Sequence, residues 1–253
     1  MATDVKNDPD LATSLVAYYE LEEASGTRID SHTNGYDLSE FNSVTQQSPA
    51  IVGNGASFNR ANSEYLRSTN SGLQITSDIS FAAWIYPQSA SARLLLWNTF
   101  TVSGGVRGLI TALEKSGSNF VFRFANYVSG SGKDANFNSA TFTVNTWAHL
   151  AFSYDISAGE VKVYKNGSLV ETQTGFRTSI TTLTNSYFGI DDNLGSVNFY
   201  NGDLDEMALW SKVITAAEIT DLYNSGSGIP YDAGGGGGGG AAQTARRGAV
   251  MMM

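Results

Sequence analysis

Short turn signals interrupt this sequence every eight to fifteen residues between positions 34 and 202. Examples are Asn34-Gly35, Gly53-Asn54-Gly55, Gly104-Gly105, Ser116-Gly117, Asn166-Gly167 and Asn201-Gly202. Short segments bounded by Gly and Asn turns are typical of β-strands. The spacing therefore predicts a chain that is β throughout this block.

The segments between the turns alternate in polarity, as strands do. Phe120, Phe122 and Phe124 fall on one side of a strand, with Val121 and Arg123 on the other. Residues 161–164 and 169–172 flank an Asn-Gly pair, which supplies the positive φ angles of a type I′ turn. They are therefore predicted to form a hairpin.

A short helix is predicted near the end of the block. Thr215 and Glu218 have the spacing of a capping box, and Ile219, Leu222 and Tyr223 follow at helical intervals. Residues 224–228 provide the stop. We expect this helix to lie on the rim of the sheets.

The chain has 253 residues, of which 42% are hydrophobic, and that is enough for one large core. No repeat of fixed period is visible, which disfavours propellers and solenoids. The predicted fold is all-β: a two-sheet antiparallel jelly-roll sandwich of about a dozen strands with one short C-terminal helix.

The two ends differ from this block in composition. Residues 1–13 are polar and are expected to be a flexible N-terminal segment. Seven consecutive glycines at 234–240 cost too much backbone entropy to order themselves. We therefore expect a folded domain over residues 14–232 and a Gly-rich flexible tail over 233–253.

Composition excludes several classes of site and partner. The chain has no cysteine, so disulfides and thiolate sites are excluded, and two histidines cannot supply a multi-histidine zinc cluster. Its 24 acidic residues outnumber 15 basic ones, which argues against a nucleic-acid partner. We predict no membrane insertion, because no apolar run approaches eighteen residues, and we see no signal peptide.

Five segments, in this order, resemble the laminin-G-like jelly roll of the concanavalin A-like lectin/glucanase superfamily. They are LVAYYEL (15–21), GNGASF (53–58), ISFAAWIYP (79–87), TWAHLAFSYD (146–155) with VYKNG (163–167), and GDLDEMALW (202–210) with AAEI (216–219). The resemblance covers residues 15–224. It implies the fold more than the function, because this fold carries lectins, adhesion modules and glycosidases alike.

The resemblance also implies a structural calcium ion. Asp30 and Asp205 match the carboxylate positions, and Asn34 or Gly35 would donate backbone carbonyl oxygens. Calcium takes six to eight oxygen ligands, which such a loop can supply. The alternative is that Asp30 makes an Asx turn and Asp205 a hydrogen bond at a strand end.

A catalytic site is not expected. Retaining glucanases of this superfamily carry alternating carboxylates on one strand, about 5 Å apart. Here strand periodicity puts Asp203, Asp205 and Met207 on one face, so the last carboxylate is missing and Glu206 points away. His149 lies in an apolar strand and is expected to be packed in the core.

Aromatic side chains are the candidates for a ligand platform, since lectin sites stack rings on sugars. Trp97, Phe100 and Tyr127 lie in the stretch that resembles the family least, which makes them the candidates for ligand binding. The alternative is that these rings are packed in the core.

Three functions follow as hypotheses. The first is a non-catalytic, calcium-stabilised surface-recognition module that binds a glycan or a protein surface. The second is a structural or decoration component of a virus particle or another extracellular assembly, which the missing export signal and the Gly-rich tail favour. The third is a glycoside hydrolase, disfavoured by the missing carboxylate. Localisation stays open, with a virion or cell-surface assembly suspected.

Overall fold

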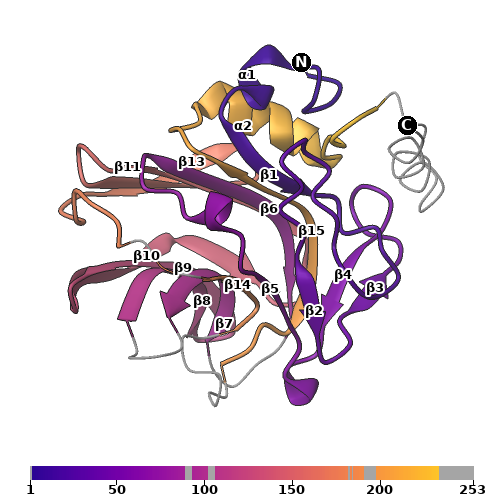
Figure 1. The fold of residues 1–253 in the computed structure, drawn as a ribbon, viewed down its shortest axis with the longest axis horizontal. Helices are drawn as coiled ribbons and strands as arrows, with labels where there is room; N and C mark the ends of the chain where they lie inside the picture. The colour runs from indigo at the N-terminus through magenta and orange to yellow at the C-terminus, as the bar shows by residue number, and fades with distance from the viewer. Residues whose placement is uncertain are drawn as a thin grey trace, which may run out of the picture.

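Two antiparallel sheets packed face to face form the molecule (Figure 1). The computed structural model describes residues 2–88, 93–101, 106–181, 183, 185–190 and 198–233. The predicted all-β sandwich with a short C-terminal helix is confirmed. The Gly-rich tail expected beyond position 233 lies outside the described residues.

Within the described residues one sheet has eight strands and the other has seven. The eight-stranded sheet runs in the order β13 (Ser168–Gln173), β12 (Glu160–Lys165), β11 (Ala148–Asp155), β6 (Ile79–Pro87), β15 (Gly202–Trp210), β4 (Gly55–Phe58) and β3 (Thr45–Gln47), and β1 (Leu15–Tyr19) pairs with β15. The seven-stranded sheet runs in the order β10 (Ser131–Thr143), β9 (Asn119–Val128), β8 (Val106–Ser116), β7 (Leu94–Thr101), β14 (Asn185–Phe188), β5 (Tyr65–Ser68) and β2 (Ser39–Phe41).

The alternation in the sequence decides which side chains enter the core. Phe120, Phe122 and Phe124 of β9 all lie in the main core between the sheets, as predicted. The hairpin between β12 and β13 turns at Asn166 and Gly167, whose φ angles are +50° and +77°. Both are positive, as a type I′ turn requires.

One strand departs from simple alternation. The register between β15 and β6 shifts after Asp205, and Glu206 has a φ of +48°. This bulge puts Met207 in the core, where the regular pattern had placed it beside Asp205. Glu206, expected to point away, instead reaches the side on which Asp205 lies.

The C-terminal helix α2 (Ala216–Tyr223) has the predicted capping box between Thr215 and Glu218. It covers the outer face of the eight-stranded sheet, where Ile219 and Leu222 pack in a second apolar cluster. The predicted position on the rim is therefore corrected. The apolar stripe of the helix finds more area to bury on the face than on the edge.

Residues 2–13 are packed against this same face, which differs from the flexible segment expected there. Val5 and Leu11 are buried, and the helix α1 (Pro9–Ala12) is capped by Asp8. Lys6 N donates to Tyr231 O at 2.8 Å, so the N-terminal segment pairs with residues just after α2. Figure 1 shows α1 beside α2, with the N-terminus at the same end of the molecule.

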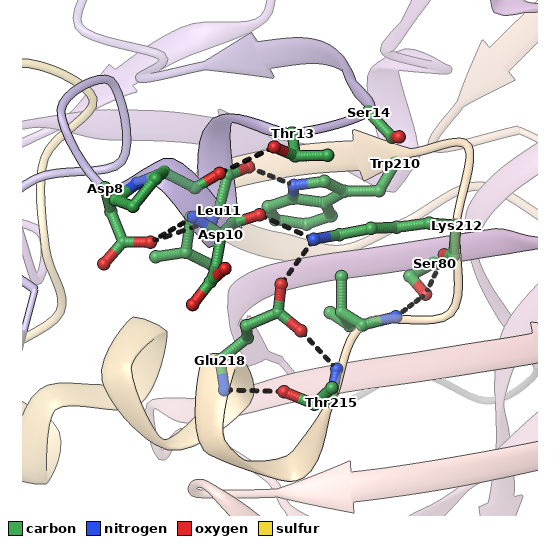
Figure 2. Close-up of polar contacts among 12 residues, drawn as sticks. Asp8, Asp10, Leu11, Thr13, Ser14, Ser80, Trp210, Lys212, Thr215 and Glu218 are labelled. Carbon is green, nitrogen blue, oxygen red and sulfur yellow. Dashed lines mark hydrogen bonds and ion pairs between the residues drawn. The ribbon is translucent and has the colours of Figure 1, made fainter.

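Polar contacts join the N-terminal segment to β15 and α2 (Figure 2). Trp210 Nε1 donates to Leu11 O at 2.7 Å, and Lys212 Nζ donates to Asp10 O at 2.6 Å. The same ammonium group also pairs with Glu218. Two separated apolar residues, Val5 and Leu11, are too sparse to show a period, which is why composition alone indicated a free end.

Candidate functional site

Asp30 organises the loop that follows β1. Its Oδ1 accepts N–H groups from Tyr18 at 2.9 Å and from His32 at 3.0 Å, and its Oδ2 accepts from Tyr36 N at 2.9 Å. The side chain is 5% exposed, and burial raises the pKa of its carboxyl despite these hydrogen bonds. Asp30 therefore serves as an acceptor for three backbone amides.

Asp205 serves a different loop. Its Oδ2 accepts N–H groups from Ile51 and Val52, both at 2.9 Å, while its buried Oδ1 has no hydrogen-bond partner among the described residues. Burial raises the pKa of Asp205 to about 8. Glu206 lies next to it, bonded to the Tyr18 hydroxyl, and burial with the Asp205 charge raises its pKa well above the usual value.

The expected calcium ligands thus contact separate segments. Asp30 binds the loop at 32–36, and Asp205 binds the loop at 51–52. Asn34 donates through Nδ2 to Val16 O at 2.9 Å, and Gly35 N lies 3.4 Å from His32 O. Among the described residues, no three His, Cys, Asp or Glu side chains form a group that could hold a metal. Three buried carboxylate oxygens of β15 have no hydrogen-bond partner among the described residues: Asp203 Oδ1, Asp205 Oδ1 and Glu206 Oε1.

The carboxylates of β15 that most nearly match a glucanase motif are enclosed. Asp203 is 4% exposed and Asp205 is not exposed at all. The bulge brings Glu206 to the side of Asp205, whereas strand periodicity alone predicts that it points away. These buried carboxylates hold backbone amides and a tyrosine hydroxyl.

His149 is buried between aromatic rings, as the sequence predicted. Its ring lies 5.3 Å from that of Trp84 and 6.2 Å from that of Tyr223. Burial lowers the pKa of His149 to about 3, so the imidazole is neutral in the folded protein. Its Nδ1 has no partner among the described residues. This histidine belongs to the packing under α2.

The three candidate ligand-binding aromatics are not brought together. Trp97 is fully buried, with its ring centroid 6.3 Å from that of Phe81 and 6.5 Å from that of Phe188, so it is a core residue. This corrects its assignment to a ligand surface. Tyr127 is half-buried, and its hydroxyl lies 3.1 Å from Asp134 Oδ2. The side chain of Phe100 lies outside what the structure describes.

A polar cleft lies where two loops meet at one end of β2 and β5. Its volume is about 500 Å³, and its lining residues are all small or polar. They are Gly35, Asp37, Ser39, Ser68, Thr69, Asn70 and Ser71. Gly35 was predicted here as a calcium ligand, but the remaining six were not singled out. The run Ser-Thr-Asn-Ser at 68–71 was the signal that could have found them.

The walls of this cleft are held by hydrogen bonds within each loop. Asp37 Oδ1 accepts from Asp30 N at 3.0 Å, and Asn70 Oδ1 accepts from Gly72 N at 2.9 Å. The two loops touch where the Tyr36 ring covers Gly72: a Cβ atom at Gly72 would lie 2.1 Å from Tyr36 Cζ. A larger residue there would force the Tyr36 ring to move.

No helix among the described residues is long and apolar enough to cross a membrane.

Solved structures share this fold at low sequence identity. Domain 4 of AbnA, a GH43 extracellular arabinanase from Geobacillus stearothermophilus, solved with arabinotriose, is 20% identical with a TM-score of 0.64. The match covers 83% of this chain and 98% of that domain. The receptor-binding domain of botulinum neurotoxin type G is 12% identical with a TM-score of 0.62, over 84% of this chain and 51% of that one.

The binding domain of Paraclostridial Mosquitocidal Protein 1 is 16% identical with a TM-score of 0.64, over 84% of this chain and 52% of that one. This chain therefore spans about half of the two toxin domains it resembles. No curated protein sequence matches it significantly. A laminin G family model, described as the concanavalin A-like lectin/glucanases superfamily, matches residues 60–220. With well over half of its residues matched and both predicted sheets in place, the chain belongs to the concanavalin A-like lectin/glucanase superfamily.

Proposed function

We propose that this protein is a non-catalytic carbohydrate-recognition module. The observation that carries the proposal is the likeness to a domain solved with arabinotriose, 98% of which is matched by this chain. A further similar structure, the binding domain of botulinum neurotoxin DC, was solved in complex with SialylT. Saccharide recognition is thus a recurring use of this sandwich among the solved structures that resemble it.

The burial of the β15 carboxylates supports a binding role over hydrolysis. A retaining glycosidase needs two carboxyl groups about 5 Å apart that open onto the glycosidic bond. Asp203 and Asp205 are buried, and Asp205 is held by two backbone amides. An enzyme built on this strand would first have to expose them.

Calcium remains part of the proposal, with Asp205 as the carboxylate at which it would bind. The buried Oδ1 of Asp205 is unpaired among the described residues, and Glu206 and Glu22 both interact with Asp205 electrostatically. A bound calcium ion would supply a positive charge beside Asp205 and Glu206, whose pKa values are raised by burial. Asp30 already accepts three backbone N–H groups, so the proposal places the ion at Asp205.

The test is binding of the purified chain to immobilised neutral and sialylated oligosaccharides, arabinotriose among them, followed by titration calorimetry of each positive. Saturable binding to at least one saccharide is expected. Binding to none would contradict the proposal. Release of reducing sugar from a β-glucan that disappears in Asp203→Ala or Asp205→Ala protein would show an enzyme instead.

A role in a virus particle or another assembly, or on the cell surface, stays a prediction from the sequence. Recognition of a protein surface is likewise untested. Finding this chain at fixed copy number in purified particles would favour the assembly role over a free lectin.

A further inference from the structure

The polar cleft at 35–71 offers hydrogen-bonding groups that the protein itself leaves unused. The side-chain hydroxyls of Ser39, Thr69 and Ser71 have no hydrogen-bond partner among the described residues, and all three side chains are exposed. Asn70 uses its Oδ1 for Gly72 N, so its amide N–H donors remain available. A ligand can therefore bind here without breaking a contact of the fold.

The chemistry of these groups favours a polyhydroxylated ligand. Hydroxyl groups both donate and accept, the Asn70 amide donates, and the Asp37 carboxylate accepts. A saccharide hydroxyl is itself donor and acceptor, so it can match each of them. No lysine or arginine lines the cleft. A sulfated, phosphorylated or sialylated group would bring a second negative charge close to the Asp37 carboxylate, whereas a neutral sugar would not.

The shape of the cleft is set before a ligand arrives. Asp30 fixes the first loop through Tyr36 N and through its own N–H to Asp37. Ser68 Oγ accepts from Asn70 N at 3.2 Å in the second loop, and the Tyr36 ring on Gly72 joins the two. A preformed site loses less conformational entropy on binding. The cleft is open to solvent, with a volume of about 500 Å³, so a ligand can enter without rearrangement of the loops.

An aromatic surface continues from the cleft along β2. Ser39 is paired with Arg67 across the sheet, and Phe41 shares the face of Ser39 because alternate residues point the same way. Phe41 stacks on Tyr65 with ring centroids 4.5 Å apart, and the Arg67 guanidinium lies 4.5 Å from the Phe41 centroid. Because Tyr65 and Arg67 both pack on the Phe41 ring, a second sugar unit would contact the edges of this stack.

We propose that this cleft is the saccharide site, and that it takes a neutral sugar unit through Ser39, Thr69, Asn70, Ser71 and Asp37. The inference rests on the proposed function and adds to it the place of binding and the charge of the ligand.

The experiment removes the hydroxyls and leaves the fold intact. The triple variant Ser39→Ala/Thr69→Val/Ser71→Ala changes exposed side chains only, so its melting temperature should equal that of the wild type. The matched control is Ser139→Ala/Thr141→Val/Ser168→Ala, three exposed hydroxyls on β10 and β13, at the other end of the strand order in each sheet. The probe is the neutral oligosaccharide that the wild type binds most tightly among those immobilised.

We expect the triple variant to weaken binding by about tenfold or more, since each lost hydrogen bond contributes a few-fold, and the control to bind as the wild type does. Asp37→Asn, which keeps the acceptor for Asp30 N, should also weaken it. Equal binding by wild type and triple variant would show that the cleft is not the saccharide site, while the proposed function would still hold. A wild type that binds no saccharide overturns both. If the wild type and the control bind a sialylated oligosaccharide and the triple variant does not, the cleft takes a charged ligand, which would contradict the neutral one.

Discussion

Asp30 and Asp205 show how one residue type serves two purposes in the same fold. Both were predicted to ligate calcium. Asp30 accepts backbone N–H groups from its own loop, and Asp205 accepts them from residues 51–52, far away in the sequence. An aspartate near a turn has the right length to bond its own loop, and sequence spacing does not distinguish this from metal ligation. An aspartate can ligate a metal only if further oxygen atoms lie close to its carboxylate, and the tertiary structure decides whether they do.

Replacing Asp30 tests its role as a loop acceptor. Asp30→Ala leaves three N–H groups without an acceptor, so we expect unfolding free energy to fall by about 3 kcal/mol or more. Asp30→Asn keeps the Oδ1 acceptor for Tyr18 and His32 and should lose less. Urea denaturation measures both. Equal losses in the two variants, or a loss present only with calcium, would contradict this role.

His149 makes stability depend on pH. Its pKa is about 3 in the folded protein against about 6.5 in the unfolded chain, so between these values the unfolded state binds a proton that the folded state excludes. Stability is therefore retained above pH 6.5 and is lost as pH falls towards 3, by at most about 1.4 kcal/mol per pH unit.

The variant His149→Phe removes this proton and keeps an aromatic ring between Trp84 and Tyr223. We expect its unfolding free energy to fall less steeply with acid than that of the wild type, while the difference between the two proteins stays constant above pH 7. Denaturant titrations at several pH values measure this. Parallel curves from pH 4 to 7 would show that folding does not lower the pKa of His149.

Among the elements, the N-terminal segment departs most from expectation. Val5 and Leu11 close the apolar cluster beneath α2, and Trp210 donates to Leu11 O. The segment therefore acts as a clip that joins the two ends of the domain (Figure 2). An isolated one-turn helix is unstable in water, so α1 depends on this packing.

Truncating one side chain of the clip measures its contribution. Leu11→Ala should lower unfolding free energy by about 2–5 kcal/mol, as for other buried leucines, whereas Thr3→Ala changes an exposed residue and should be near neutral. Thermal and urea unfolding compare the two. A Leu11→Ala protein as stable as the Thr3→Ala control would return the segment to the flexible status that its composition indicated.

At the scale of the whole molecule, the proposed calcium ion should affect the stability of the native state. If the ion binds the native state alone, it stabilises by about 2.7 kcal/mol at a hundred times its dissociation constant. We expect calcium to raise the melting temperature and chelation to lower it. Asp205→Asn should abolish the response, and Asp30→Asn should keep it. A melting temperature indifferent to calcium and chelator would remove the ion from the proposal.

The sequence alone determined most of the architecture. The patterns that did so are the turn signals, the alternation of Phe120 to Phe124 and the capping box at Thr215. These patterns are local, since side-chain direction and turn conformation depend on a few adjacent residues. The position of α2 was predicted wrongly, because the sequence of the helix does not show whether the face or the rim of a sheet lies beneath its apolar side.

Tertiary structure alone decided the bulge at Glu206, the burial of Trp97 and the clip at Val5 and Leu11. Each depends on a partner far along the chain: Tyr18 for Glu206, Phe188 for Trp97 and Tyr231 with Trp210 for the clip. The cleft also depends on contacts between residues that are far apart in the sequence. Its two loops are about thirty residues apart in sequence, and the Tyr36 ring on Gly72 makes them one site.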